Sequence, residues 1–410
     1  MRTEAAPARL DGGRKVVVHV ITRFVRGGAD ENTLLSCNAQ AEAGHSVVLV
    51  FGGDNSAEMR ARLDRRVLQI CLPALVRRVD PVRDARALLG LLSLFAELKP
   101  DIVHTHTSKA GILGRLAGHF AGAGAVVHGV HILPFVNVGR IPHAAYLTME
   151  RLLDPLTDAF IDVSDDLRDT CVHARVGAAS AHTVIPSGME IERFRCAEPV
   201  SPDELARTFA WRGAAPPRLV VMAAALEPRK RVVEFIRAFK RVVRTHPNAL
   251  LALLGEGIER LRALDQIDAL GLSHNVRLLG FRDDVERWIA AADVCVLASE
   301  REGLPRAVVQ YVLAARPVVV SALPGIGAIL SHGRNGFITD GDDVGEMAAP
   351  ISRLLSEPAL ALAFEAYSRR LNLSAWSVQN MTAELEQVYE RVLYEPRDPR
   401  AKDGEAAWIS

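Results

Sequence analysis

The chain has 410 residues, 49% hydrophobic and 24% charged, with 49 basic residues balanced by 49 acidic ones. This composition is typical of globular proteins and argues against disordered and collagen-like classes. The balanced charge disfavours a nucleic-acid partner, because binding to phosphates requires an excess of cations. The length predicts two domains rather than one.

The cysteines and the apolar runs indicate a cytoplasmic protein. Five cysteines, an odd number without C-x-x-C spacing, argue against a disulfide framework and a zinc knuckle. The first apolar run, residues 16–21, is shorter than the core of a signal peptide. The longest, residues 87–96, is far below the roughly 20 residues that span a bilayer. We therefore expect no transmembrane segment, which leaves peripheral membrane contact open.

The first half of the chain alternates β-branched runs with helical patterns. Residues 15–21 predict a strand that leads through Gly27-Gly28 into a helix at about 31–43. Short apolar strands separated by helices indicate βαβ units in a parallel sheet. Further strands are predicted at 46–51, 101–104, 125–130 and 159–163, and further helices at 83–98, 109–120 and 143–156.

The pattern restarts after a polar, proline-containing stretch at 198–203. Strands are predicted at 219–225, 249–254, 276–280, 294–297 and 318–321, with an amphipathic helix at 232–244. The sequence thus predicts an α/β protein of two doubly wound, Rossmann-like domains that face each other across a cleft. The expected parts are a disordered tail at 1–13, an N-terminal domain at 14–197, a C-terminal domain at 198–375, a helix at 376–394 that caps either domain, crossing back to the first in one arrangement, and a tail at 395–410.

Three features are candidates for ligand binding or catalysis, and each also has a purely structural explanation. Gly27-Gly28 lies where a helix start favours an anion such as phosphate, although a tight turn with positive φ explains it equally well. Lys230 follows the first strand of the second domain, either near the cleft or in a solvated charge cluster. Glu302 and Gln310, about two helical turns apart and therefore expected on one helix face, suit a polyhydroxylated ligand or are an N-cap and a core glutamine. The N–H groups of Gly303 and Leu304 would approach the same ligand.

Four histidines lie near two predicted strand ends: His104, His106, His128 and His131. There is no H-E-x-x-H motif or supporting carboxylate spacing, so hydrogen bonding to a ligand is preferred over a metal site. His131 follows its strand directly and is expected to reach the cleft. His128 alternates with it and is expected to point into packing.

Taken in order, the segments resemble the family-4 retaining glycosyltransferases of the GT-B fold, from about residue 15 to 393. The chain looks most like the branch that acts in bacterial polysaccharide or natural-product glycosylation. The motifs that carry the resemblance include Lys99-Pro-Asp-Ile-Val-His-Thr-His106, Val130-His-Ile-Leu-Pro-Phe135, Glu302-Gly-Leu-Pro305 and Asn335-Gly-Phe337.

The resemblance implies transfer of a hexose, with retention and without a metal or a cofactor. The donor would be a nucleoside diphosphate-sugar, with a UDP-sugar expected, and the acceptor a hydroxyl or amine of a small-molecule, glycan or lipid-linked acceptor. Lys230, His131 and Glu302 would be catalytic, with Lys230 on the diphosphate and the other two beside the sugar. The implied donor-binding residues are Gly27, Gly28 and Arg229 or Arg231 at the diphosphate, Gln310 at the ribose, and Phe281 and Arg282 at the base.

The chain departs from the family pattern at three positions. The usual Glu-x7-Glu ends in Gln310, the arginine usual before Pro-x-Lys is Ala225, and an acidic residue is replaced by Ala328. We therefore keep two alternatives to a glycosyltransferase. One is a nucleotide-sugar 2-epimerase on the same fold, and the other is a non-catalytic partner that binds nucleotide sugar.

Overall fold

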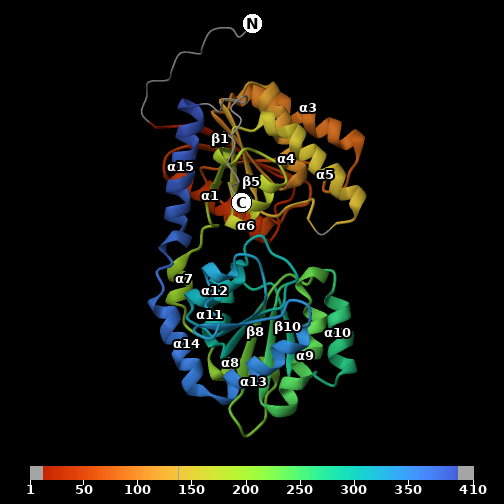
Figure 1. Ribbon diagram of the computed structural model, residues 1–410, viewed down its shortest axis with the longest axis vertical. Helices are drawn as coiled ribbons and strands as arrows, with labels where there is room; N and C mark the ends of the chain where they lie inside the picture. The colour runs from red at the N-terminus through yellow and green to blue at the C-terminus, as the bar shows by residue number, and fades with distance from the viewer. Residues whose placement is uncertain (1–12, 137, 396–410) are drawn as a thin grey trace, which may run out of the picture. The chain divides into compact units, whose positions relative to one another are not determined.

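The computed structural model describes residues 13–136 and 138–395, which form two compact units (Figure 1). The first unit contains the chain up to Gly188 and the C-terminal segment from Val378, and the second contains Met189–Ser377. The expected tails lie outside the described residues, apart from residues 13 and 395. Among the residues that are described, no helix is long and apolar enough to cross a membrane.

A seven-stranded parallel sheet forms the centre of the first unit, in the order β3-β2-β1-β4-β5-β6-β7. Its strands are β1 (Val16–Ile21), β2 (Ser46–Gly52), β3 (Leu68–Leu72), β4 (Ile102–His106), β5 (Ala125–Val130), β6 (Ala159–Asp162) and β7 (His182–Val184). The α-helices of this unit are α1 (Gly28–Glu42), α2 (Ala57–Ala61), α3 (Pro81–Leu98), α4 (Ser108–Phe120), α5 (Arg140–Leu153), α6 (Asp165–His173) and α15 (Val378–Tyr394).

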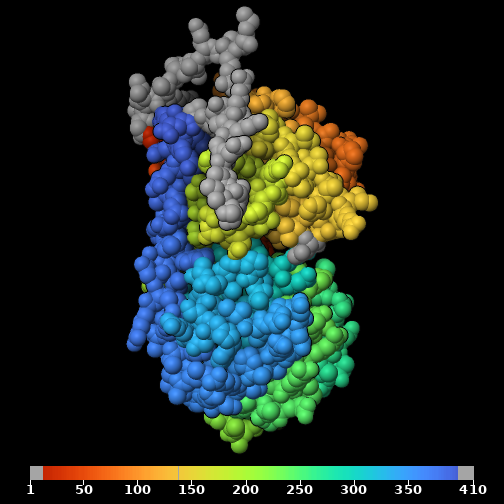
Figure 2. Space-filling model, viewed as in Figure 1, coloured from red at the N-terminus to blue at the C-terminus, as the bar shows by residue number. Residues whose placement is uncertain are grey.

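Helices cover both faces of this sheet, and the alternation of β1 shows how. Val17 and Ile21 pack on the face that carries α1 and α15, whereas Val18 and Val20 pack on the face that carries α3 and α4. In Figure 1, α15 accordingly runs beside α1, and α3 and α4 lie on the other side of β1. Figure 2 shows the outer side of α15 as a band along this unit. A strand position therefore determines which helices its side chain meets.

A buried ion pair joins α4 to α5. Arg115 Nη2 lies 2.6 Å from Glu150 Oε2, and the side chains are 0% and 7% exposed. Arg115 also donates from Nε to the main-chain oxygen of Gly111 at 2.9 Å. Removal of either partner would leave a buried charge without compensation.

A six-stranded parallel sheet forms the centre of the second unit, in the order β10-β9-β8-β11-β12-β13. Its strands are β8 (Arg218–Ala223), β9 (Ala249–Leu254), β10 (Val276–Gly280), β11 (Val294–Leu297), β12 (Val318–Ser321) and β13 (Gly336–Thr339). Its α-helices are α7 (Ile191–Arg195), α8 (Pro202–Phe209), α9 (Val232–Thr245), α10 (Arg260–Ala269), α11 (Val285–Ala291), α12 (Arg306–Leu313), α13 (Ala348–Ser356) and α14 (Pro358–Arg370).

This sheet is also covered on both faces, so the predicted α/β fold with two doubly wound parallel sheets is confirmed. α8, α11 and α12 pack on one face and α9, α10 and α13 on the other. The amphipathic pattern of α9 buries Phe235, Ile236 and Phe239 against the second of these faces.

The two segments that connect the units lie side by side. The Met189 N–H donates to the main-chain oxygen of Trp376 at 2.7 Å, and Met189 forms a parallel bridge with Ser377. The second unit thus begins at Met189, before the position expected from sequence, because Phe194 of α7 is buried in its core. α15 packs into the core of the first unit, through Met381, Leu385, Val388, Tyr389 and Val392.

Candidate active site

In the second unit, two cations converge on one carboxylate. The loops after β8 and β11 leave the sheet at adjacent carboxyl ends, and they carry Lys230 and Glu302 respectively. Lys230 Nζ forms an ion pair with Glu302 Oε1, and Arg229 Nη1 lies 3.1 Å from Glu302 Oε2. Ser299 Oγ donates to Glu302 Oε1 at 2.7 Å. Arg229 also forms a 2.9 Å ion pair with Glu227. The Glu302 side chain is only 8% exposed, so the cluster contains two cations, one buried carboxylate and a second, more exposed carboxylate.

Burial changes the acid–base properties of the lysine. Loss of solvation lowers the pKa of Lys230, Glu302 acts in the opposite direction, and Arg229 lowers the pKa further. A bound anion would raise this pKa, because it favours the charged ammonium group.

Arg231, on the loop after β8, hydrogen-bonds to the loops after β11 and β13. Its guanidinium donates to the main-chain oxygens of Ala298 at 2.8 Å, Ser299 at 3.1 Å and Gly341 at 2.5 Å. Arg231 has left-handed backbone geometry, with φ of 50°. Since these contacts occupy its guanidinium, Arg231 positions the loop of Glu302, and Arg229 is the second cation of the cluster.

Two glycines allow the loop after β9 to pack directly on the loop after β8. A Cβ atom on Gly255 would lie 2.0 Å from the main-chain oxygen of Ala224, and one on Gly257 would lie 2.3 Å from that of Leu226. Gly255 also has φ of 147°. No larger residue fits at either position without moving the backbone.

The remaining donor-side candidates of the second unit lie on nearby elements. Phe281 is 48% exposed on the loop after β10. Its neighbour Arg282 forms two 2.7 Å hydrogen bonds with Asp284, which hold its guanidinium. Gly303 and Leu304 continue the loop from Glu302 to α12, and Gln310 is half-buried within that helix. Because α12 begins only at Arg306, helical spacing does not place Glu302 and Gln310 on one face, contrary to the expectation from sequence.

In the first unit, Gly27 and Gly28 form the start of α1. Gly27 is the N-cap residue, with φ of −164° and ψ of 170°, and Gly28 is the first helical residue. Neither has positive φ, so the turn explanation for this pair is wrong. A Cβ atom on Gly27 would instead lie 2.6 Å from Asp30 Oδ2. Burial raises the pKa of Asp30 to about 7, although Arg23 opposes the shift.

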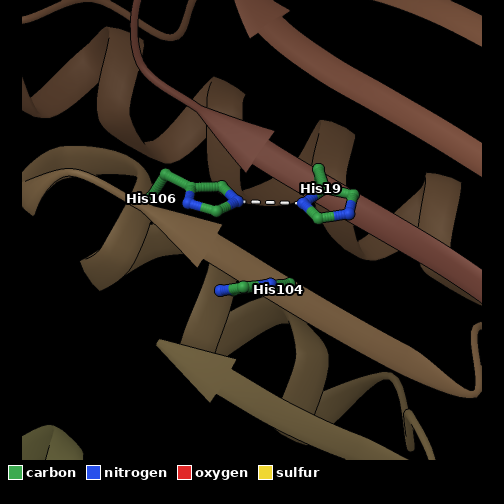
Figure 3. A group of neighbouring side chains, drawn as sticks. All are labelled: His19, His104 and His106. Atoms are coloured by element: carbon green, nitrogen blue, oxygen red, sulfur yellow. Dashed lines mark hydrogen bonds between the residues drawn. The ribbon is translucent and has the colours of Figure 1, made fainter. Parts of the chain in front are cut away.

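Three histidines gather on the sheet face that carries α1 and α15. His19 of β1 is in register with His104 of β4, and His106 lies two residues further along the same face. All three are buried, and their ring nitrogens lie within 4.8 Å of one another, close enough to hold a metal ion (Figure 3). His106 Nε2 and His19 Nδ1 form a 2.9 Å hydrogen bond. Both ring nitrogens of His106 thus bond to other histidines, His19 and His131, whereas direct bonding of His104 to a ligand stays a prediction.

His131 lies at the edge of this group. Its Nε2 is 3.0 Å from His106 Nδ1. His131 lines two small hollows of the first unit, one shared with residues 132–135 and a smaller one shared with His104, His106 and Asn32. His128 points to the opposite sheet face, where its Nδ1 lies 2.9 Å from Thr105 Oγ1. It is buried in packing, as alternation along β5 predicts.

Two family models match successive parts of the chain, one in each unit for most of its length. Residues 26–193 match the model "Glycosyltransferase Family 4", and residues 208–371 match "Glycosyl transferases group 1". The chain belongs to the family-4 glycosyltransferases. The glycosyltransferase is 29% identical over 304 residues to UDP-Gal:alpha-D-GlcNAc-diphosphoundecaprenol alpha-1,3-galactosyltransferase of Escherichia coli, a match that covers 73% of this chain and 77% of that protein.

Other similar proteins agree with this assignment. The capsular polysaccharide biosynthesis glycosyltransferase CapM of Staphylococcus aureus is 23% identical, with 76% of this chain and 82% of CapM covered. Among solved structures, Anabaena HepE in complex with UDP-glucose has a TM-score of 0.75 at 20% identity, with 92% and 100% of the chains covered. That likeness shows the fold of this glycosyltransferase, which is GT-B.

The structure groups some of the expected site residues and adds others. Lys230, Arg229 and Glu302 are in direct contact, and His131 contacts His106. Arg282 is instead paired with Asp284. Sequence reasoning missed Ser299, three residues before Glu302, and missed the contribution of α1 and α15 to the histidine group. The two helices contribute Gln40 and Tyr389, whose side chains bond to each other although they are 349 residues apart, so no local sequence signal indicates this contact.

Proposed function

We propose that this glycosyltransferase moves a hexose from a UDP-sugar to a hydroxyl group of a glycan or lipid-linked acceptor in polysaccharide biosynthesis. We also propose that it retains the anomeric configuration and needs no metal ion. The proposed substrates have the chemistry named for the E. coli relative, a UDP-hexose and a sugar carried on undecaprenyl diphosphate. Two alternatives, a 2-epimerase and a non-catalytic partner, have no comparable support among the relatives.

The cluster of Lys230, Arg229 and Glu302 carries the proposal. The leaving group of the reaction is a nucleoside diphosphate, and its developing negative charge is best stabilised by preorganised cations. The cluster places two cations beside the buried Glu302 carboxylate, with Glu227 on the outer side of Arg229, at the carboxyl end of a parallel sheet, where such folds bind ligands. Lys230 is therefore assigned to the diphosphate, with Arg229 beside it in place of the missing arginine at Ala225.

The same charges support independence from metals. A metal ion in other transferases supplies positive charge to the diphosphate oxygens. Lys230 and Arg229 supply that charge from the chain itself, and Ser299 holds the carboxylate of Glu302 in place between them. Glu302 is assigned to hydroxyl groups of the sugar, because an ionised carboxylate accepts hydrogen bonds.

Other residues are assigned by their place in the fold. Gly303 and Leu304 would donate main-chain N–H groups to the sugar, Gln310 would bind the ribose, and Phe281 would pack against the base with Arg282 beside it. In the first unit, His131 is assigned to the sugar. Gly27 and Gly28 are assigned to the diphosphate, since the start of α1 offers free N–H groups.

Incubation of the purified chain with UDP-hexoses and a polyprenyl diphosphate-linked sugar tests the reaction. The expected product is a new α-linkage from an α-configured donor, identified by NMR, with the rate unchanged by EDTA. Epimerised donor in the absence of acceptor would support the epimerase instead, and absence of any turnover would support the non-catalytic partner.

A pair of lysine variants tests the site. Lys230→Ala should abolish most turnover. Lys240→Ala is a matched control, because Lys240 lies on α9 of the same unit and donates only to the main-chain oxygen of Leu270 among its described contacts. Equal activities of the two variants would contradict the assignment of Lys230.

A cytoplasmic location is part of the proposal. All five cysteines are free thiols, three of them buried and none in a disulfide. Unpaired cysteines are typical of a reducing compartment.

A further inference from the structure

His131 is the outer end of a hydrogen-bonded chain that runs through the core of the first unit. Beyond His106, the chain passes from His19 Nε2 to Gln40 Oε1 at 2.8 Å, and from Gln40 Nε2 to the hydroxyl of Tyr389 at 3.2 Å. Tyr389 in turn lies 2.7 Å from His104 Nδ1. Gln40 comes from α1 and Tyr389 from α15, and both are completely buried.

The amide of Gln40 gives this chain a direction. Its oxygen faces His19 and can only accept, so His19 carries its proton on Nε2 and accepts on Nδ1. His106 must then donate from Nε2 to His19, which leaves its Nδ1 as the acceptor for His131 Nε2–H. The argument requires neutral imidazoles. Burial satisfies this condition, since it lowers the pKa of His19 to about 4 and that of His106 well below its usual range.

We propose that Gln40 and Tyr389 are positioning residues that hold His131 in the Nε2–H tautomer, so that its Nδ1 offers a lone pair to a substrate hydroxyl. The inference rests on the proposed role of His131 at the sugar. Without the relay, a neutral imidazole exchanges between two tautomers, and only one of them can accept a hydrogen bond at Nδ1. Partners that orient a functional imidazole in this way act through hydrogen bonds to its other nitrogen.

Tyr389 closes the inner end of the relay. Because its oxygen accepts from Gln40, its own proton goes to His104 Nδ1, and His104 then carries its proton on Nε2. That nitrogen has no hydrogen-bond partner among the described residues, and His104 lines the same small hollow as His131. A metal ion bound by His19, His104 and His106 would need lone pairs that the relay already uses, so the two arrangements exclude each other.

Nitrogen NMR of the full-length protein with labelled histidine tests the tautomer without any substrate. Chemical shifts separate protonated from unprotonated ring nitrogens, and His131→Gln assigns the His131 signals. The expected spectrum has His131 protonated at Nε2 and unprotonated at Nδ1. A wild-type spectrum with the proton on Nδ1, or a shift of the core histidine signals on addition of Zn²⁺ at equimolar concentration, would overturn the proposal.

Kinetics of a Gln40 variant test its effect on the reaction. Gln40→Leu removes the acceptor for His19 and should lower kcat about 10- to 100-fold, with the KM for UDP-sugar little changed. Ser36→Ala is the matched control, because Ser36 is a buried polar residue of α1 that faces Met381 of α15 outside the relay.

The outcomes separate this inference from the proposed function. Full activity of His131→Ala would refute the role assigned to His131 itself. An inactive His131→Ala combined with a fully active Gln40→Leu would refute only the relay. If Gln40→Leu does not fold, the wild-type spectrum still decides, since a proton on Nδ1 of His131 would contradict the proposal.

Discussion

Asp30→Asn is expected to stabilise the first unit, and more so at high pH. Asp30 lies in the first turn of α1 and is only 8% exposed. The helix start favours its charged form, but burial outweighs that effect and raises its pKa to about 7. The folded state therefore prefers the neutral acid, whereas the unfolded chain ionises near its ordinary pKa of 3.8.

The magnitude follows from the difference between these two pKa values. About three pH units, at about 1.4 kcal/mol each, give a penalty of about 4 kcal/mol for holding the carboxylate in the folded protein above pH 7. The penalty grows as the pH rises from 3.8 to 7, so it is about 2 kcal/mol at pH 5. Asparagine carries no charge and should recover these amounts at each pH.

Hydrogen exchange measured by mass spectrometry on peptides from β1 and α1 is a suitable assay. Tryptophan fluorescence would not report on this unit, because Trp211, Trp288 and Trp376, the tryptophans of the described chain, lie in the second unit. Asp165→Asn is the control, since Asp165 occupies the first turn of α6 with a side chain that is 71% exposed. A gain that is the same at pH 5 and pH 8, or equal to that of the control, would refute the reasoning.

Four further substitutions test the other buried charges and the division of roles in the site. Lys230→Ala should lower kcat by about 10²–10³-fold without unfolding the second unit, and near wild-type turnover would contradict its role. Glu302→Gln should reduce transfer more than UDP affinity, and Gln310→Ala should do the reverse; equal losses of UDP affinity, measured by calorimetry, would contradict this division. Arg115→Met leaves Glu150 buried and unpaired, so hydrogen exchange should show a loss of about 3–5 kcal/mol in the first unit, and a loss below about 1 kcal/mol would show that Glu150 becomes solvated.

The central strands of both sheets could be predicted from sequence, as could the edge strand β10, whereas the other three edge strands could not. β1, β4, β8 and β11 are apolar runs buried on both faces, which produces a strong local signal. The strands that the sequence analysis missed, β3, β7 and β13, all lie at sheet edges. Their residues are largely half-buried or exposed, so their composition is close to that of a loop.

The candidate site likewise contains residues that the sequence predicts and residues whose roles depend on the fold. Lys230 and Glu302 lie on loops at strand ends, and short motifs mark them. The roles of Arg231 and Gln40 depend on which main-chain oxygens or side chains reach them from distant segments. Arg231 looked like a further cation for the diphosphate, and only the structure shows that it binds the main chain of the loop of Glu302.

α15 belongs to the first unit but is the last helix to be synthesised, so the unit that is translated first is completed last. The first unit lacks part of its core until the last helix is made, because Leu385, Val388 and Tyr389 pack beside β1 and α1. The ribosome must first add the whole second unit, Met189–Ser377, which takes roughly 10 to 40 s at the usual rate of translation. The second unit is contiguous in sequence and can fold during that interval, whereas the first remains incomplete. Truncation of the C-terminus would therefore damage the unit that was translated first and leave intact the one that directly precedes the cut.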